Sequence, residues 1–103
     1  MPYHSSEEIF GIVRSERALV TYFSTTECQV CKVLRPKVER MVAEHTGIRF
    51  LYVDSALHPE VTGQHLVFAV PTIILFSDGR EMRRFSRNLS LDDLDRALRM
   101  LPR

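Results

Sequence analysis

The chain has 103 residues, a length that suits a single domain with one hydrophobic core. Apolar residues make up 45% of it and charged residues 26%, which is ordinary for a soluble globular protein, and the formal net charge is +1. This balance argues against a nucleic-acid or membrane surface driven by bulk charge. We expect one domain over residues 1–103, with neither nucleic acid nor a membrane as partner.

The N-terminal eight residues contain neither a basic region nor an apolar run, so they do not resemble a secretory signal. No apolar segment approaches the ~20 residues that a membrane span requires. We therefore expect a cytoplasmic protein. In a reducing compartment, two cysteines separated by two residues are more often catalytic or metal-binding than a permanent crosslink.

The first predicted elements are a short helix and a strand. Ser5 and Glu8 have the spacing of a capping box, and an apolar helical face follows over residues 9–13. Residues 18–23 are apolar except for Thr21, which indicates a central strand buried on both faces.

A long helix is predicted next, and the only two cysteines of the chain lie at its start. Apolar side chains recur in it at spacings of three and four residues: Cys31, Leu34, Val38, Met41 and Val42. We expect the helix to reach about Glu44, with a kink at Pro36 because proline removes a backbone donor. Gly47 is well placed to end it.

The second half of the chain predicts three strands and two helices. Residues 48–53 read as a second buried strand, and residues 59–65 as a short helix that begins at Pro59. Residues 72–76 and 81–85 read as strands joined at Asp78-Gly79, a strong hairpin signal. A final helix follows Ser90, with leucines along one face. Alternating strands and helices predict an α/β fold: a mixed sheet flanked by helices on both faces.

The cysteines lie where the first strand gives way to the long helix. A helix N-terminus offers free N–H groups and the positive end of a dipole, so it stabilises a thiolate and lowers the pKa of a thiol there below ~8.5. Cys28 falls in the cap region, where solvent reaches it, and Cys31 falls one turn later on the core-facing stripe. We therefore expect Cys28 to be the nucleophile and Cys31 the resolving thiol.

Two other interpretations of the pair remain open. Both cysteines are structural in the first, with the pKa of an ordinary thiol. They form half of a zinc site in the second, but the four histidines, at positions 4, 45, 58 and 65, include no H-x₃₋₅-H pair and no second C-x-x-C exists. We expect no metal.

Five features follow one another in order along the chain: Cys28-Gln29-Val30-Cys31-Lys32, Pro36 in the helix, Asp54 after the second strand, Val70-Pro71-Thr72 and Asp78-Gly79. With these features the chain resembles the thioredoxin family over residues 18–101. The resemblance implies a thioredoxin fold in which Cys28 attacks a disulfide and Cys31 resolves the intermediate. It also implies a cis Val70–Pro71 bond, with Pro71 facing the cysteines and the Val70 backbone pairing with an extended substrate.

The chain also departs from the family pattern around the site. Glu27 replaces the usual Trp before the first cysteine, Gln29-Val30 replaces Gly-Pro, and the chain contains no Trp. Thr21 aligns with the buried aspartate that assists the resolving thiol, and Phe50 with its lysine partner. Arg87 takes the place of a family glycine.

Glu27, Thr21 and Arg87 are candidates to modulate the site, Thr21 through the position that it takes in the alignment. Glu27 opposes a thiolate at Cys28 if it turns inward, and is otherwise a solvated turn residue. Arg87 either favours the thiolate or is one more exposed arginine. Phe68 is a candidate for the apolar substrate contact that the missing Trp does not supply.

The resemblance implies a thiol–disulfide oxidoreductase without cofactor, acting on disulfide-containing protein substrates and reduced by an external reductase. A binding module that uses the Val70-Pro71 surface, with slow or absent redox turnover, is the alternative. A glutathione-dependent enzyme similar to glutaredoxins is a third interpretation, although no Gly-Gly-x-Asp signature precedes the final helix.

Overall fold

A computed structural model describes residues 4–87 and 89–103. Eight elements follow one another along the chain: α1 (Ser6–Ser15), β1 (Ala18–Ser24), α2 (Gln29–Ala43), β2 (Arg49–Asp54), α3 (Pro59–Gln64), β3 (Thr72–Ser77), β4 (Arg80–Phe85) and α4 (Leu91–Met100). This order agrees with the one predicted from the sequence, with boundaries that differ by a few residues. Of the helices in the described part of the chain, none is long and apolar enough to cross a membrane.

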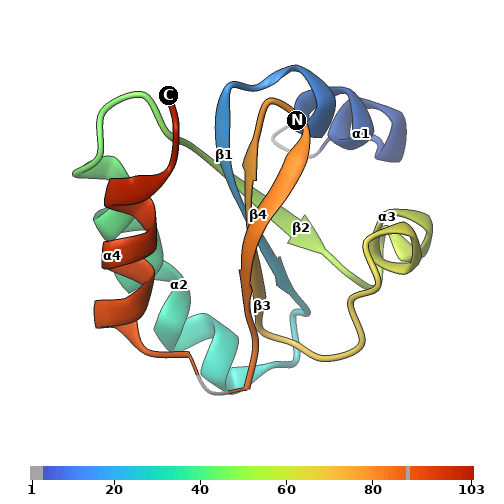
Figure 1. Cartoon of the computed structure of the whole chain (residues 1–103). Coiled ribbons are helices and arrows are strands. Elements are labelled where there is room, and N and C mark those ends of the chain that lie inside the picture. The colour runs from blue at the N-terminus through green and yellow to red at the C-terminus, as the bar shows by residue number, and fades with distance from the viewer. Residues whose placement is uncertain (1–3, 88) are drawn as a thin grey trace.

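The four strands form one mixed sheet in the order β2-β1-β3-β4. β1 pairs with β2 in parallel, whereas β3 pairs with both β1 and β4 in antiparallel orientation. Helices α2 and α4 cover one face of the sheet, and α1 and α3 cover the other (Figure 1). The predicted mixed sheet with helices on both faces is confirmed.

β1 lies in the centre of the molecule, as its apolar sequence predicts. All seven of its residues are buried. Because side chains alternate along a strand, Val20 and Tyr22 point into the core under α2 and α4, while Leu19 and Phe23 point into the core under α1 and α3. β1 ends at Ser24, and the short loop that follows it carries Cys28.

β2 is not the buried strand that its sequence suggested. It lies at the edge of the sheet, and burial alternates along it, with Leu51 and Val53 buried and Arg49 exposed. An edge strand has one side open to solvent, so half-buried aromatic residues are stable there. Phe50 and Tyr52 lie on the face covered by α2.

Local signals set several boundaries as predicted. Ser5 and Glu8 form a reciprocal capping box at α1. Asp78 and Gly79 form the β3–β4 hairpin, both with positive φ (51° and 83°), and the Gly79 Cα lies against the α1 backbone, so that a Cβ there would lie 3.3 Å from the Arg14 carbonyl oxygen. α2 continues through Pro36 but ends at Ala43, before the turn containing Gly47.

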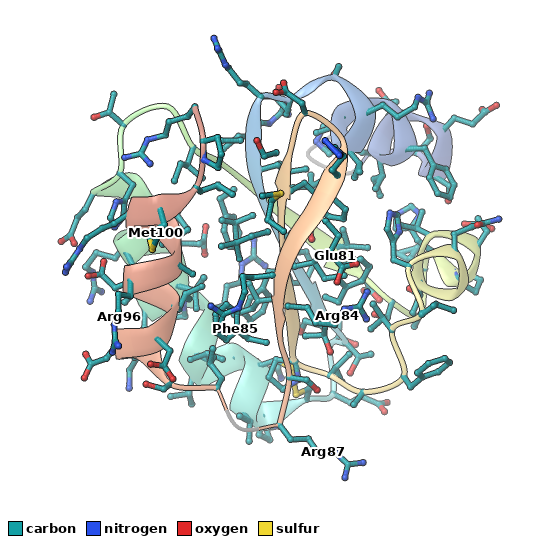
Figure 2. All side chains as sticks on the ribbon, viewed as in Figure 1. Glu81, Arg84, Phe85, Arg87, Arg96 and Met100 are labelled. Atoms are coloured by element: carbon teal, nitrogen blue, oxygen red, sulfur yellow. A yellow bond between two sulfur atoms is a disulfide. The ribbon has the colours of Figure 1, made fainter. Side chains whose placement is uncertain are left out.

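β4 forms the other edge of the sheet, and its two faces differ (Figure 2). Phe85 packs into the core under α4. Glu81 and Arg84 are paired at 2.7 Å, and the Arg84 guanidinium also donates to the carbonyl oxygens of His65 and Leu66. Arg84 thus holds the start of the loop that leads from α3 to β3.

Candidate active site

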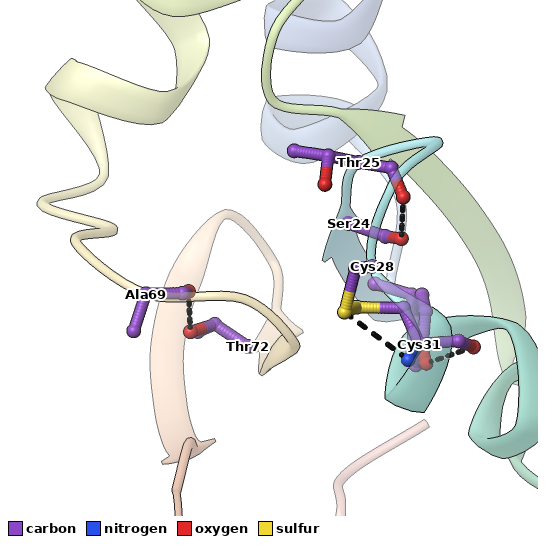
Figure 3. The surroundings of a disulfide bond; sticks show 7 residues. Ser24, Thr25, Cys28, Cys31, Ala69 and Thr72 are labelled. Carbon is purple, nitrogen blue, oxygen red and sulfur yellow. Dashed lines mark hydrogen bonds between the residues drawn. A yellow bond between two sulfur atoms is a disulfide. The ribbon is translucent and has the colours of Figure 1, made fainter.

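Cys28 and Cys31 form a disulfide at the N-terminus of α2 (Figure 3). Their Cα atoms are 5.2 Å apart. Cys28 is the N-cap residue of the helix, and its Sγ accepts a hydrogen bond of 3.2 Å from the Cys31 backbone N–H. Sulfur therefore occupies the place where a serine or aspartate oxygen usually caps a helix.

The two cysteines differ in exposure in the predicted sense. Cys28 is half-buried, while Cys31 is 1% exposed and belongs to the core under α2 and α4. The cap position places Cys28 at the positive end of the helix dipole, where an anionic sulfur is stabilised.

Tyr22 is the residue of β1 that contacts Cys31. It is fully buried, and its hydroxyl donates a hydrogen bond of 2.8 Å to the Cys31 carbonyl oxygen. Burial raises the pKa of Tyr22 to about 12, with a smaller contribution from Tyr52, so the hydroxyl stays protonated at neutral pH.

Thr21 does not take the position expected of it beside the resolving thiol. Its side chain lies on the opposite face of the sheet from Cys31, since neighbouring residues of a strand point to opposite faces and Tyr22 points toward Cys31. The Thr21 hydroxyl is fully buried and donates to the Ile74 carbonyl oxygen at 2.9 Å. The interpretation of Thr21 as a modulator of Cys31 is therefore wrong in its geometry.

An aromatic stack continues from Tyr22 toward the surface. The Tyr22 ring lies 6.0 Å from Phe50 and 6.3 Å from Tyr52, measured between ring centroids. The Arg35 guanidinium covers the Tyr52 ring at 3.8 Å and pairs with Glu39 at 3.1 Å. Phe50 thus adds an apolar contact to this aromatic stack.

The loop before β3 passes close to the disulfide, and Ala69 and Thr72 lie across from it (Figure 3). The Val70–Pro71 peptide bond is cis, as the resemblance implied. Val70 packs against the core cluster that contains Cys31, and the Thr72 hydroxyl donates to the Ala69 carbonyl oxygen at 2.6 Å. Phe68 is 89% exposed, so an aromatic ring stands free in the loop that leads to Val70.

The two charged candidates are both exposed. Glu27 lies in the turn before Cys28. Arg87 follows β4 and extends away from the body of the molecule (Figure 2). The structure brings neither side chain into a hydrogen bond or ion pair with another described residue. Within residues 4–87 and 89–103, no three His, Cys, Asp or Glu side chains are arranged to hold a metal ion.

Comparison with known proteins agrees with this geometry. The family model described as Thioredoxin matches residues 3–100. The chain belongs to the thioredoxin family. It is 32% identical to the thioredoxin of Chlamydia trachomatis over 97 residues, which cover 94% of this chain and 91% of that protein. It is 27% identical to the thioredoxin-like protein YdfQ of Bacillus subtilis, covering 97% and 89% of the two chains.

Solved structures give the same result. Thioredoxin 1 of Thermosipho africanus is 32% identical with a TM-score of 0.74, covering 80% of this chain and 91% of that one. A mutant thioredoxin of Halobacterium salinarum shares the fold with a TM-score of 0.84 at 22% identity, covering 97% and 88%. Thioredoxin-family membership and the bonded cysteine pair make this chain a thiol–disulfide oxidoreductase with Cys28 and Cys31 as its redox pair.

Two residues beside the pair were not identified from the sequence of this thioredoxin-family chain. Tyr22 is marked by strand alternation, which sets it on the same face as Val20 and under the helix. Arg35 is four residues after Cys31, so it lies on the same side of α2. Both signals are present in the sequence, but they become informative only once the face covered by α2 is known.

Proposed function

We propose that this chain reduces disulfide bonds in protein substrates, with Cys28 as nucleophile and Cys31 as resolving thiol. The cap geometry carries the proposal. Cys28 is the more exposed of the two, sits at the positive end of the α2 dipole and accepts a backbone N–H. Each of these features favours the thiolate, and the thiolate is the attacking form.

The reaction proceeds in two exchanges. The Cys28 thiolate attacks one sulfur of the substrate disulfide and forms a mixed disulfide, and the other substrate sulfur leaves as a thiolate. Cys31 then attacks the Cys28 sulfur, which forms the Cys28–Cys31 disulfide seen here and frees the second substrate thiol. An external reductase returns the pair to the dithiol, and we place the cycle in the cytoplasm.

Exposed apolar side chains near the disulfide support a protein substrate. Val30 and Val33 of α2 are each 64% exposed, and Phe68 is 89% exposed. Exposed apolar groups of this kind bind a polypeptide surface more strongly than they bind a small polar disulfide or thiol. We assign Phe68 to substrate contact, and Val70 and Pro71 to backbone pairing with an extended substrate segment.

The test is reduction of a small disulfide-bonded protein with dithiothreitol as the electron source. The wild-type protein should accelerate the reaction, and Cys28→Ser should abolish the acceleration. Cys31→Ser should accumulate a mixed disulfide at Cys28, visible by mass spectrometry. Binding of the substrate without acceleration by the wild type would instead identify a binding module that has kept the fold.

A further inference from the structure

A small cavity, open to solvent, lies beside Cys31. Its volume is 280 Å³, and Cys31 forms part of its wall. The other lining residues come from the end of β1 and its loop, from α2 and from β2: Ser24, Thr25, Thr26, Lys32, Arg35 and Tyr52. Because the cavity is open and its lining includes hydroxyl and charged side chains, water can enter it and find hydrogen-bond partners there.

The charged groups in its wall have one sign. Lys32 and Arg35 are cationic, and both follow Cys31 on α2. Arg35 is held in place, since its guanidinium rests on the Tyr52 ring at 3.8 Å and its Nε donates to Glu39 at 3.1 Å. A fixed cation beside a thiol favours the thiolate.

The other side chains that pack with Cys31 in the core cluster are uncharged. Tyr22 of β1 donates to its carbonyl oxygen and stays protonated, and Tyr52 of β2 lies under Arg35. The side chains that pack on the same cluster from the Val70 loop, α4 and the segment before it are apolar: Val70, Leu89, Leu91 and Leu94. Among the described residues, no carboxylate lines the cavity, so none is placed there as a general base; Glu39 pairs with Arg35 but is not part of the cavity wall.

We propose that Arg35 is a positioning residue for the resolving step, in which it stabilises the Cys31 thiolate across this cavity while the thiol proton passes to water there. The inference rests on the dithiol mechanism above. Cys31 loses a proton to water and attacks the Cys28 sulfur, so the Cys28–Cys31 bond forms and the bond from Cys28 to the substrate sulfur breaks. The bonding electron pair leaves on the substrate thiolate, which takes a proton from solvent. The cysteine pair loses two electrons, and the substrate disulfide gains two.

The experiment is a single-turnover reaction of the reduced protein with an aromatic disulfide reagent that releases a coloured thiol. The first release reports attack by Cys28 and depends on reagent concentration. The second release reports attack by Cys31 and does not. Its rate is measured from pH 5 to pH 9 in the wild type, in Arg35→Gln and Arg35→Lys, and in Arg40→Gln, which removes the same charge from an exposed position on α2.

In Arg35→Gln, the pH midpoint of the second release should rise by roughly 0.5–1 unit, because a nearby opposite charge shifts a thiol by about this much after screening. Release at pH 6.5 should then be roughly three- to tenfold slower than in the wild type, and the rates should converge at high pH. Arg35→Lys should retain most of the effect, and Arg40→Gln should match the wild type.

A midpoint that moves no more in Arg35→Gln than in Arg40→Gln would overturn the proposal, as would uniform slowing at every pH, which marks a structural effect. A wild type that lacks the second release altogether would contradict the dithiol mechanism itself, so the two failures are distinguishable. Cys31→Ser identifies the second release, because it must lack that phase.

Discussion

The Tyr22 hydroxyl donates a hydrogen bond of 2.8 Å to the carbonyl oxygen of Cys31. This contact joins the central strand β1 to the first turn of α2, nine residues later in the chain. It is fully buried, so it links the core directly to the helix end that holds the redox pair. Loss of this hydrogen bond should therefore change both the unfolding free energy and the way in which that free energy depends on pH.

Removing this hydroxyl should destabilise the protein. Tyr22→Phe keeps the ring and its packing but leaves the Cys31 carbonyl oxygen without this donor, which typically costs about 1 kcal/mol of unfolding free energy. Urea denaturation of the oxidised protein measures the difference. Tyr52→Phe is the matched control, because it keeps the ring under Arg35, and its effect should be smaller. Equal stability of wild type and Tyr22→Phe would contradict the prediction.

Tyr22 should also make stability fall at high pH. Burial raises its pKa from 10.0 to about 12, so the folded state holds this proton more tightly than the unfolded state. The stabilisation is complete below pH 10 and is lost as pH rises from about 10 to about 12. The difference in unfolding free energy between wild type and Tyr22→Phe, measured by urea denaturation at each pH, should shrink across this window. A difference that stays constant would contradict the raised pKa.

Alkylation should distinguish the two cysteines. In the reduced protein at pH 7, iodoacetamide should modify Cys28 at least about tenfold faster than Cys31, because Cys28 caps α2 and is half-buried, while Cys31 is 1% exposed. Peptide mapping by mass spectrometry at short times measures both rates. Faster labelling of Cys31 would reverse the assignment of nucleophile and resolving thiol.

Phe68 should affect protein substrates selectively. Because the ring is 89% exposed, Phe68→Ala should leave the melting temperature nearly unchanged. The KM for a disulfide-bonded protein should rise roughly three- to tenfold, since an aromatic contact in an interface commonly contributes more than ~1 kcal/mol. Reaction with a small disulfide should not change.

Met100→Ala is the control for Phe68→Ala. Met100 is also apolar and 81% exposed, but it lies at the C-terminal end of α4 (Figure 2). Met100→Ala should change neither the KM for the disulfide-bonded protein nor the reaction with the small disulfide. Equal losses in the two variants would show that Phe68 has no special place in substrate contact.

The stability contributed by the contact between the end of α2 and α4 should be lost in acid. The His45 ring donates to Asp95 at 2.8 Å, and this bond, with a further one from Arg99, lowers the pKa of Asp95 below its ordinary value of 3.8. Stability from this carboxylate is therefore present above pH 3.8 and is lost as pH falls through the lower, folded-state pKa. Asp95→Asn should lower the melting temperature at pH 6, and its difference from wild type should vanish at strongly acid pH.

Glu44→Gln provides the comparison for Asp95→Asn, since it neutralises an exposed carboxylate at the C-cap of α2. The difference in melting temperature between Glu44→Gln and the wild type should be small at both pH values. A deficit in Asp95→Asn that is the same at pH 6 and in strong acid would mean that the carboxylate charge is not what stabilises the contact between α2 and α4.

The sequence alone determined the order of elements and the location of the redox pair. The apolar run 18–23, the C-x-x-C before a helical stripe and the Asp78-Gly79 turn are local patterns, and each specifies its own element because backbone conformation there depends on nearby residues. The difference in burial between Cys28 and Cys31 follows from helical periodicity in the same way.

Tertiary structure decided which side chains meet the pair. Thr21 and Tyr22 are neighbours in a strand where every side chain is buried, so composition cannot say which of them points toward Cys31. Only the docking of α2 on one face of the sheet selects Tyr22. The same docking brings Tyr52, from a strand that proved to be an edge, beneath Arg35, because contacts between elements depend on register and packing that no local pattern specifies.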